Sequence, residues 1–270
     1  MRLPGCVDEA KIANTPHDAF SLFISDDILN IILTHTNQKI HDYLFNFTGK
    51  IQKWMQQTSL DTLRAVIGLL IYGGVFESSH KHTESLYKMD ETGRLIFPVV
   101  MVKNHFRFLL SMIRFDDKAT RTEHRSEDKM VASREIWDMF IGLCKSLYLV
   151  GSAICNDEQL LPFRGRCGFR QYMPKKPSKY EIKIWMMCDC ATKYMMNAKV
   201  YMGKENNEVA RGLASDVVCT LVQPISGHYV CRDHISMIVT CDTCKNKDEN
   251  MNLISRLVFP TLLLLLLQTI

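Results

Sequence analysis

Two neighbouring carboxylates followed by a dense run of cations form the part of this sequence best suited to chemistry. Residues 156–183 read NDEQLLPFRGRCGFRQYMPKKPSKYEIK, with Asp157 and Glu158 near the start and Glu181 near the end. The whole chain carries a formal net charge of only +4, so this positive charge is a local feature that generates a local field. The seven cations of the stretch are Arg164, Arg166, Arg170, Lys175, Lys176, Lys179 and Lys183.

A second acid completes a candidate metal site. Asp233 lies in a candidate strand, residues 228–234, and would face Asp157 if the two strands were neighbours. Paired carboxylates suit Mg²⁺ or Mn²⁺, and two such ions can activate a nucleophile and stabilise a leaving oxygen in phosphodiester chemistry. Taken singly, Asp157 reads as a solvated acid and the basic run as a solvated loop. Together they favour a metal-dependent nucleic-acid site.

The basic run is suited to holding a phosphate backbone. Arginine binds phosphate bidentately, and lysine serves as a point charge. Such contacts release counterions and make binding depend on salt. Aromatic side chains interleave with the charges and are placed to pack on sugars or bases. They are Phe163, Phe169, Tyr172 and Tyr180.

Helical periodicity dominates the first 150 residues, which must position this stretch. Ser25 is placed to cap one predicted helix and Ser59 a second, each followed by apolar residues at helical spacing. Two more predicted helices span residues 105–115 and 133–148, with a charged loop, residues 116–129, between them. We interpret the apolar stripes as core packing, and this half indicates no chemistry by itself.

The pattern changes to strands near Val150. Residues 153–163 form a predicted strand with acids at its centre, and residues 183–190 and 193–203 form a predicted antiparallel hairpin. A predicted helix over residues 205–222 and the strand over residues 228–234 follow. The order strand, strand, strand, helix, strand is an α/β unit preceded by a helical domain, so the predicted fold class is α+β.

Composition bounds the remaining possibilities. Hydrophobic residues make up 47% of the 270 residues, enough for a sizeable core. Met1 to Cys6 lacks the apolar region of a secretory signal, so we expect the ten cysteines to be reduced thiols rather than disulfides. The alternative is zinc binding by the pairs Cys188/Cys190 and Cys241/Cys244. A four-ligand zinc site usually needs two matched pairs of ligands, and neither pair has a matching partner in the sequence. The apolar run 258–270 is shorter than the roughly 20 residues that span a bilayer, so we expect no membrane association.

The stretch from Asn156 to Asp189 resembles the piggyBac transposase family. Members carry the pattern D-E-Q-L-x-x-F-R-G-R-x-x-F-x-x-Y-x-P-x-K-P-x-K-Y-x-I-K. The resemblance reaches into the helical half through Thr15-Pro16, the RFDDK run 114–118 and residues 136–138, and it covers roughly residues 14 to 233. The matching positions are Asp157, Glu158, Gln159, Leu160, Phe163, Arg164, Gly165, Arg166, Phe169, Tyr172, Pro174, Lys176, Pro177, Lys179, Tyr180, Ile182 and Lys183.

The resemblance implies an RNase H-like catalytic domain with three aspartates and two divalent metal ions, Mg²⁺ or Mn²⁺, that cuts and rejoins DNA at transposon ends. It also implies a nuclear protein, and a helical part that contributes to DNA binding and to a homodimer. Asp157 falls on the first catalytic aspartate of the pattern. Asp233 fits the second, although the Asn and the aromatic pair that follow it in the family are absent. Asp242 is the alternative, and we prefer Asp233 because it lies closer behind the predicted helix.

No residue of this sequence matches the third aspartate of the family. Asp248 and Glu249 are the later acids, and they fit no family pattern. We therefore expect a C-terminally truncated copy with three parts: a helical dimerisation and DNA-binding domain over residues 1–150, an incomplete RNase H-like domain over residues 151–238, and a divergent tail over residues 239–270. The expected function is a DNA-binding remnant without complete cleavage and strand transfer. The alternatives are a fragment of an active metal-dependent transposase, or a protein-interaction module formed by the helical half.

Overall fold

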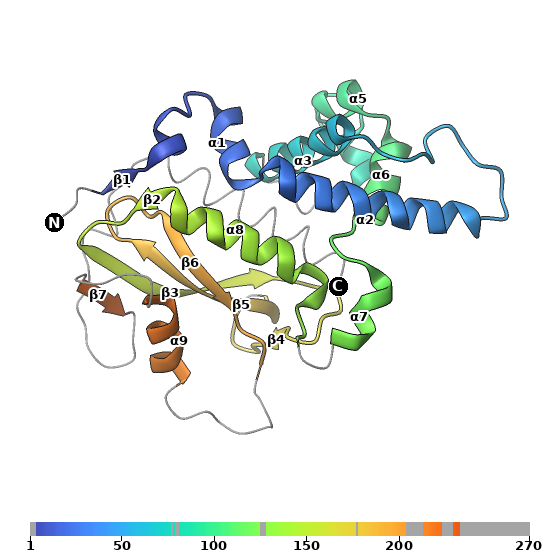
Figure 1. Cartoon of the computed structure of the whole chain (residues 1–270). Helices are drawn as coiled ribbons and strands as arrows, with labels where there is room; N and C mark the ends of the chain where they lie inside the picture. Colours follow the sequence, from blue (N-terminus) through green and yellow to red (C-terminus); the bar gives the residue numbers. More distant parts are fainter. Residues whose placement is uncertain are drawn as a thin grey trace.

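A computed structural model places a group of helices beside a mixed β-sheet (Figure 1). It describes residues 4–76, 78, 81–124, 128–176, 178–203, 213–222 and 229–232. Among these residues, no helix is both long enough and apolar enough to cross a membrane. The predicted α+β class is confirmed at the level of helices combined with a largely antiparallel sheet.

Local sequence signals start the helices of the first half. Ser25 caps α2 by accepting a hydrogen bond from the Ile28 N–H, and Ser59 caps α3 by accepting one from the Thr62 N–H at 3.2 Å, as predicted. Thr15 and Asp18 form a capping box that starts α1. The helices of this half are α1 (Pro16–Phe23), α2 (Asp26–Phe45), α3 (Leu60–Val75), α4 (Thr83–Leu86), α5 (Ile96–Val100), α6 (Lys103–Met112), α7 (Lys118–His124) and α8 (Arg134–Ser146).

The sheet is built around two ten-residue strands. β5 (Tyr180–Asp189) pairs antiparallel with β3 (Ala153–Pro162) on one side, and with the short β4 (Gln171–Tyr172) and β6 (Met195–Val200) on the other. α9 (Leu213–Val222) then leads to β7 (Tyr229–Arg232), which pairs parallel with β3. Figure 1 shows α8 and α9 on opposite sides of this sheet. The predicted hairpin and the predicted order of three strands, helix and strand are confirmed.

One hydrophobic core runs from the helices into the sheet. Phe23 of α1 packs against Phe140 of α8 and against Tyr194, which precedes β6, with ring centroids 6.2 Å apart in both cases. The Tyr194 hydroxyl donates to the Cys144 carbonyl of α8 at 2.7 Å. A two-stranded ribbon, β1 (Gly5–Cys6) with β2 (Tyr148–Leu149), ties the start of the chain to the end of α8. The helical half and the sheet therefore stabilise one another.

The structure contains short elements that were not predicted, among them α4, α5 and β4, and two other departures have a local cause. Residues 118–124 form α7 where a charged loop was expected, because Asp117 accepts a hydrogen bond from the Ala119 N–H at the start of this short helix. α6 ends at Met112 rather than at 115, since the Arg114 N–H donates to the Thr36 hydroxyl instead of continuing the helix. The first part of the predicted helix 205–222 lies outside the described residues, which include 213–222.

Candidate nucleic-acid interface

Asp157 lies near the middle of β3, with its side chain exposed. Because side chains alternate along a strand, Asp157 shares a face with Cys155 and Gln159, while buried Ile154 and Asn156 point to the other face. Its Oδ1 accepts a hydrogen bond from the Glu158 N–H at 2.6 Å. A rigid central strand thus presents a solvent-accessible carboxylate, as a metal ligand requires.

The strand beside Asp157 is β7, which ends at Arg232. The parallel register pairs Ala153 with Tyr229 and Asn156 with Arg232. The condition under which Asp157 and Asp233 would face one another, that these two strands are neighbours, is therefore met. Asn156 and Arg232 are the last residues that pair in this register, and in the sequence Asp157 and Asp233 come directly after them. Asp233 itself, the alternative Asp242, and the acids 248 and 249 lie outside the described residues.

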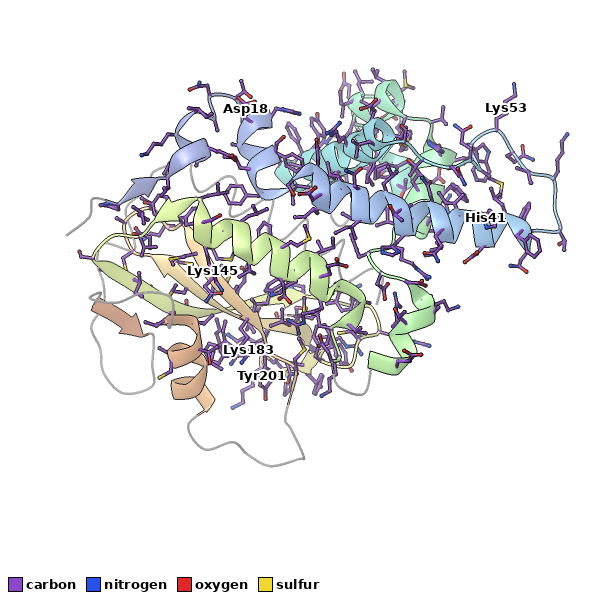
Figure 2. All side chains as sticks on the ribbon, viewed as in Figure 1. Asp18, His41, Lys53, Lys145, Lys183 and Tyr201 are labelled. Atoms are coloured by element: carbon purple, nitrogen blue, oxygen red, sulfur yellow. The ribbon has the colours of Figure 1, made fainter. Side chains whose placement is uncertain are left out.

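Glu158 points away from Asp157 and forms an ion pair with Lys183 of β5. The side chains of this pair are 37% and 20% exposed, respectively. The Lys183 Nζ also lies 4.1 Å from the centroid of the Trp185 ring. Figure 2 labels Lys183 and Tyr201 at one end of the sheet, where the Tyr201 N–H donates to the Lys183 carbonyl at 2.9 Å. The positive charge of Lys183 is thus compensated within the sheet.

Arg170 organises the loop between β3 and β4. Its Nη1 donates to the Gly165 carbonyl at 2.7 Å and to the Arg164 carbonyl at 3.2 Å. Its guanidinium lies 4.4 Å from the centroid of the Tyr180 ring, which packs against the Tyr172 ring at 5.1 Å. The guanidinium therefore shapes the loop that carries Arg164.

Five of the seven predicted cations lie exposed in the two connections that join β3, β4 and β5. The connections are held by backbone hydrogen bonds from the Phe163 N–H to the Tyr180 carbonyl at 3.0 Å, and from the Met173 N–H to the Lys179 carbonyl at 2.8 Å. Within the described part of the chain, none of the five forms an ion pair. These residues, which we call the terminal cations, are Arg164, Arg166, Lys175, Lys176 and Lys179.

The terminal cations lie beyond the end of β3, at a distance from Asp157 that can be measured along this strand. Asp157 precedes the end of β3 at Pro162 by five residues, which corresponds to about 17 Å of strand. A DNA strand advances about 3.4 Å per nucleotide, so the same distance spans about five base pairs. One ligand could contact both places only if it were longer than this.

Asp189 fixes the turn that joins β5 and β6. The side chain is fully buried, and its Oδ1 accepts hydrogen bonds from the Ala191 and Thr192 N–H groups at 2.9 and 2.8 Å. Its Oδ2 accepts one from the Gly151 N–H at 2.5 Å. Sequence reasoning missed this role, although an Asp followed by Ala-Thr at a turn is a signal of this capping.

The cysteines of the described residues fit reduced thiols. No group of three or more His, Cys, Asp or Glu side chains placed to hold a metal occurs among those residues. Cys155 and Cys188 lie opposite one another on β3 and β5, and neither forms a disulfide. Burial raises the pKa of the Cys188 thiol to about 12. Cys241 and Cys244 lie outside the described residues.

The comparison with known proteins supports a transposase family. The family model described as Transposase IS4 matches residues 15–243, a range that contains both Asp233 and Asp242. A solved structure, the cryo-EM structure of the piggyBac transposase synaptic complex with hairpin DNA, is similar to this chain at 35% sequence identity and a TM-score of 0.76. The match covers 85% of this chain and 48% of that chain, so this chain spans about half the length of that transposase.

The matched region contains the elements described above, from α1 to β7. It includes the strand that presents Asp157 and the connections that carry the terminal cations. The predicted resemblance is confirmed, and the chain belongs to the piggyBac-type transposases of the IS4 transposase family.

Proposed function

We propose that this transposase-family chain binds DNA through the terminal cations. The observation that carries the proposal is their exposure: all five project from the two connections at one end of the sheet, and none forms an ion pair among the described residues. Cations left free of protein carboxylates are available for phosphate oxygens. Tyr172, 58% exposed, and Tyr180, 44% exposed, add an aromatic surface beside them.

The strand order supports an RNase H-like catalytic domain. Three antiparallel strands are followed by a helix and by a strand that pairs parallel with the first, as in that fold. A carboxylate at the middle of the first strand and another after the fourth would then share one edge of the site. Asp157 takes the first position, and Asp233 takes the second in our proposal.

A divalent metal ion fits the donor that the described residues supply. Mg²⁺ prefers oxygen ligands and is commonly bound through one or two carboxylates with several retained waters. Asp157 provides one exposed carboxylate, and the nearby thiols of Cys155 and Cys188 are unsuited to Mg²⁺. Asp157 with Asp233 would therefore hold Mg²⁺ or Mn²⁺. The ion would supply Lewis-acid stabilisation at the phosphodiester.

The test of DNA binding compares two double variants with the same loss of charge. Lys175→Gln/Lys176→Gln removes two terminal cations, whereas Lys50→Gln/Lys53→Gln removes two exposed lysines of the loop after α2. Fluorescence anisotropy with a labelled 20-base-pair duplex should show weaker binding for the first variant and little change for the second. Equal affinities for both variants would contradict the proposal.

Metal-dependent strand cleavage is the second candidate function, favoured by the exposed position of Asp157 on a central strand. It predicts Mg²⁺-dependent nicking of supercoiled DNA that disappears in Asp157→Ala. Parallel assays of Asp233→Ala and Asp242→Ala would assign the second carboxylate. Nicking that persists in Asp157→Ala would exclude this site as its source.

A homodimer and nuclear location complete the proposal. The helical half presents apolar side chains to solvent around α5, with Leu95, Val99 and Val102 at 59%, 79% and 63% exposed. Such a surface is typical of a protein contact. Sedimentation equilibrium should report a dimer that Val99→Asp weakens, and a tagged full chain should localise to the nucleus.

A further inference from the structure

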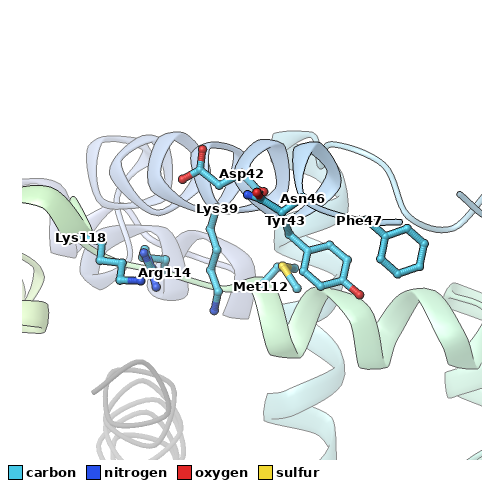
Figure 3. Close-up of a pocket in the computed structure, with 8 residues that line it drawn as sticks. All are labelled: Lys39, Asp42, Tyr43, Asn46, Phe47, Met112, Arg114 and Lys118. Carbon is cyan, nitrogen blue, oxygen red and sulfur yellow. The ribbon is translucent and has the colours of Figure 1, made fainter. Parts of the chain in front are cut away.

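A pocket in the helical half combines positive charge with aromatic rings. It has a volume of about 370 Å³ and lies between α2 and the segment from Met112 to Lys118. Lys39, Arg114 and Lys118 line one side, and Tyr43 and Phe47 line the other (Figure 3). These residues lie up to 79 positions apart, so the sequence alone does not bring them together.

The three cations of this pocket form no close ion pair with a carboxylate of the described residues. The Lys39 Nζ donates to the Ser111 carbonyl at 2.6 Å, and no ion pair involves Lys39, Arg114 or Lys118 among the described residues. The Arg114 Nε is buried without a hydrogen-bond partner there. An anion in the pocket would reduce the repulsion among three like charges.

The acids around the pocket are engaged elsewhere or point away. Asp116 forms a bidentate ion pair with Arg121, and Asp117 accepts the Ala119 N–H at the start of α7. The Asp42 carboxylate lies 3.6 Å from the His41 ring nitrogen. Figure 3 shows the Asp42 carboxylate directed away from the Lys39 ammonium. Asp42, Asp116 and Asp117 therefore attract Arg114 only at longer range, and none of them forms an ion pair with a cation of the pocket.

The other side of the pocket suits a flat ring. Tyr43 is 38% exposed and stacks on Phe47 with ring centroids 5.5 Å apart. The Phe108 ring supports Tyr43 edge-on at 5.9 Å, so the Tyr43 ring is held in position. A supported, half-exposed aromatic ring next to a phosphate-binding group is a combination that recognises nucleotides.

We propose that this pocket binds a nucleotide, with its phosphate held by Lys39, Arg114 and Lys118 and its base stacked beside Tyr43. The assignment goes beyond the DNA contact at the terminal cations and does not depend on it. Phosphate and base are both required, because the cations and the ring lie on opposite sides of one cavity. Lysine and arginine supply the charge-assisted hydrogen bonds.

The test uses dTMP, thymidine and inorganic phosphate in equilibrium dialysis against the full chain. The wild-type protein should bind dTMP more tightly than either of the other two. Lys39→Gln/Lys118→Gln should weaken dTMP binding about tenfold or more, because two charge-assisted contacts are lost. Lys118 is exposed, so Lys118→Gln alone keeps the test valid if the double variant folds poorly.

Two controls separate this pocket from the terminal cations. Lys53→Gln removes an exposed lysine of the loop after α2, labelled in Figure 2 away from the sheet, and should leave dTMP affinity unchanged. Lys175→Gln/Lys176→Gln should also leave it unchanged. Unaltered dTMP binding in Lys118→Gln and Lys39→Gln/Lys118→Gln would overturn the proposal. Inorganic phosphate that bound as tightly as dTMP would refute the role of Tyr43.

Discussion

The salt dependence of DNA binding distinguishes cations that contact phosphate from cations that hold the protein together. The sequence contains seven cations between residues 164 and 183, but the structure divides them into two classes. Lys183 is paired with Glu158 and Arg170 is bonded to loop carbonyls. The terminal cations remain exposed. We predict that single neutralisations will separate these classes by their effect on the salt slope.

The expected magnitude follows from counterion release. Each phosphate contact makes the slope of log K against log salt concentration steeper by about 0.9 for duplex DNA. Replacing the five terminal cations together should therefore reduce the slope by about 4.5, and Lys176→Gln alone by about 0.9. Lys183→Gln should change the slope by much less, because its charge is already compensated by Glu158.

Arg170→Gln provides the informative contrast. This substitution removes the hydrogen bonds to the Gly165 and Arg164 carbonyls, so it should loosen the loop that carries Arg164. We expect weaker binding at every salt concentration with nearly the same slope. Arg170→Lys keeps the charge but not the planar guanidinium, so it should resemble Arg170→Gln.

The assay is fluorescence anisotropy with a 20-base-pair duplex between 50 and 200 mM KCl, with circular dichroism to verify folding of each variant. A slope that falls by about 0.9 in Lys183→Gln would show that the ion pair with Glu158 opens on binding. A slope unchanged in the quintuple variant would refute the reasoning altogether.

Three further predictions concern stability and reactivity. Asp189→Ala should lower the free energy of unfolding by about 3 kcal/mol or more in urea titrations, because buried N–H donors lose their acceptor, whereas Asp189→Asn should lower it less. Burial and the nearby cations Arg114, Arg121 and Lys118 lower the pKa of Lys39 from 10.5 to about 8. Between these two pH values the unfolded chain binds more protons than the folded chain, so the free energy of unfolding should rise with pH. Lys39→Met should abolish this part of the rise. Iodoacetamide should modify the exposed Cys6 before Cys188, because burial raises the pKa of the Cys188 thiol to about 12. Mass spectrometry would measure the order of labelling, and early labelling of Cys188 would contradict the buried environment of this residue on β5.

Local signals account for what the sequence predicted correctly. Ser25 and Ser59 precede their helices with the spacing of an N-cap, so α2 and α3 could be located without a structure. The hairpin of β5 and β6 was readable because apolar runs flank a short turn. The family pattern around Asp157 located the candidate metal ligand on its strand.

Other features depend on contacts between distant residues. Seven cations in one stretch look alike in sequence, and only the register of β3 with β5 places Glu158 near Lys183. The pocket lined by Lys39 and Arg114 joins α2 to a segment about seventy residues later, and no periodicity predicts that meeting. The end of α6 is likewise decided by the Thr36 hydroxyl of another helix.

The hydrophobic core shared by the helices and the sheet determines which fragments of this protein can fold. Phe23, Phe140 and Tyr194 come from both sides of residue 150, and the β1–β2 ribbon joins the two ends of the helical half. A fragment ending at residue 150 would expose the side of α8 that packs on β6, and Cys144 would lose its hydrogen bond from Tyr194. Such a fragment should aggregate rather than act as a separate interaction module. The helices and the sheet should melt in one cooperative transition, so a mutation in either half lowers the stability of the other.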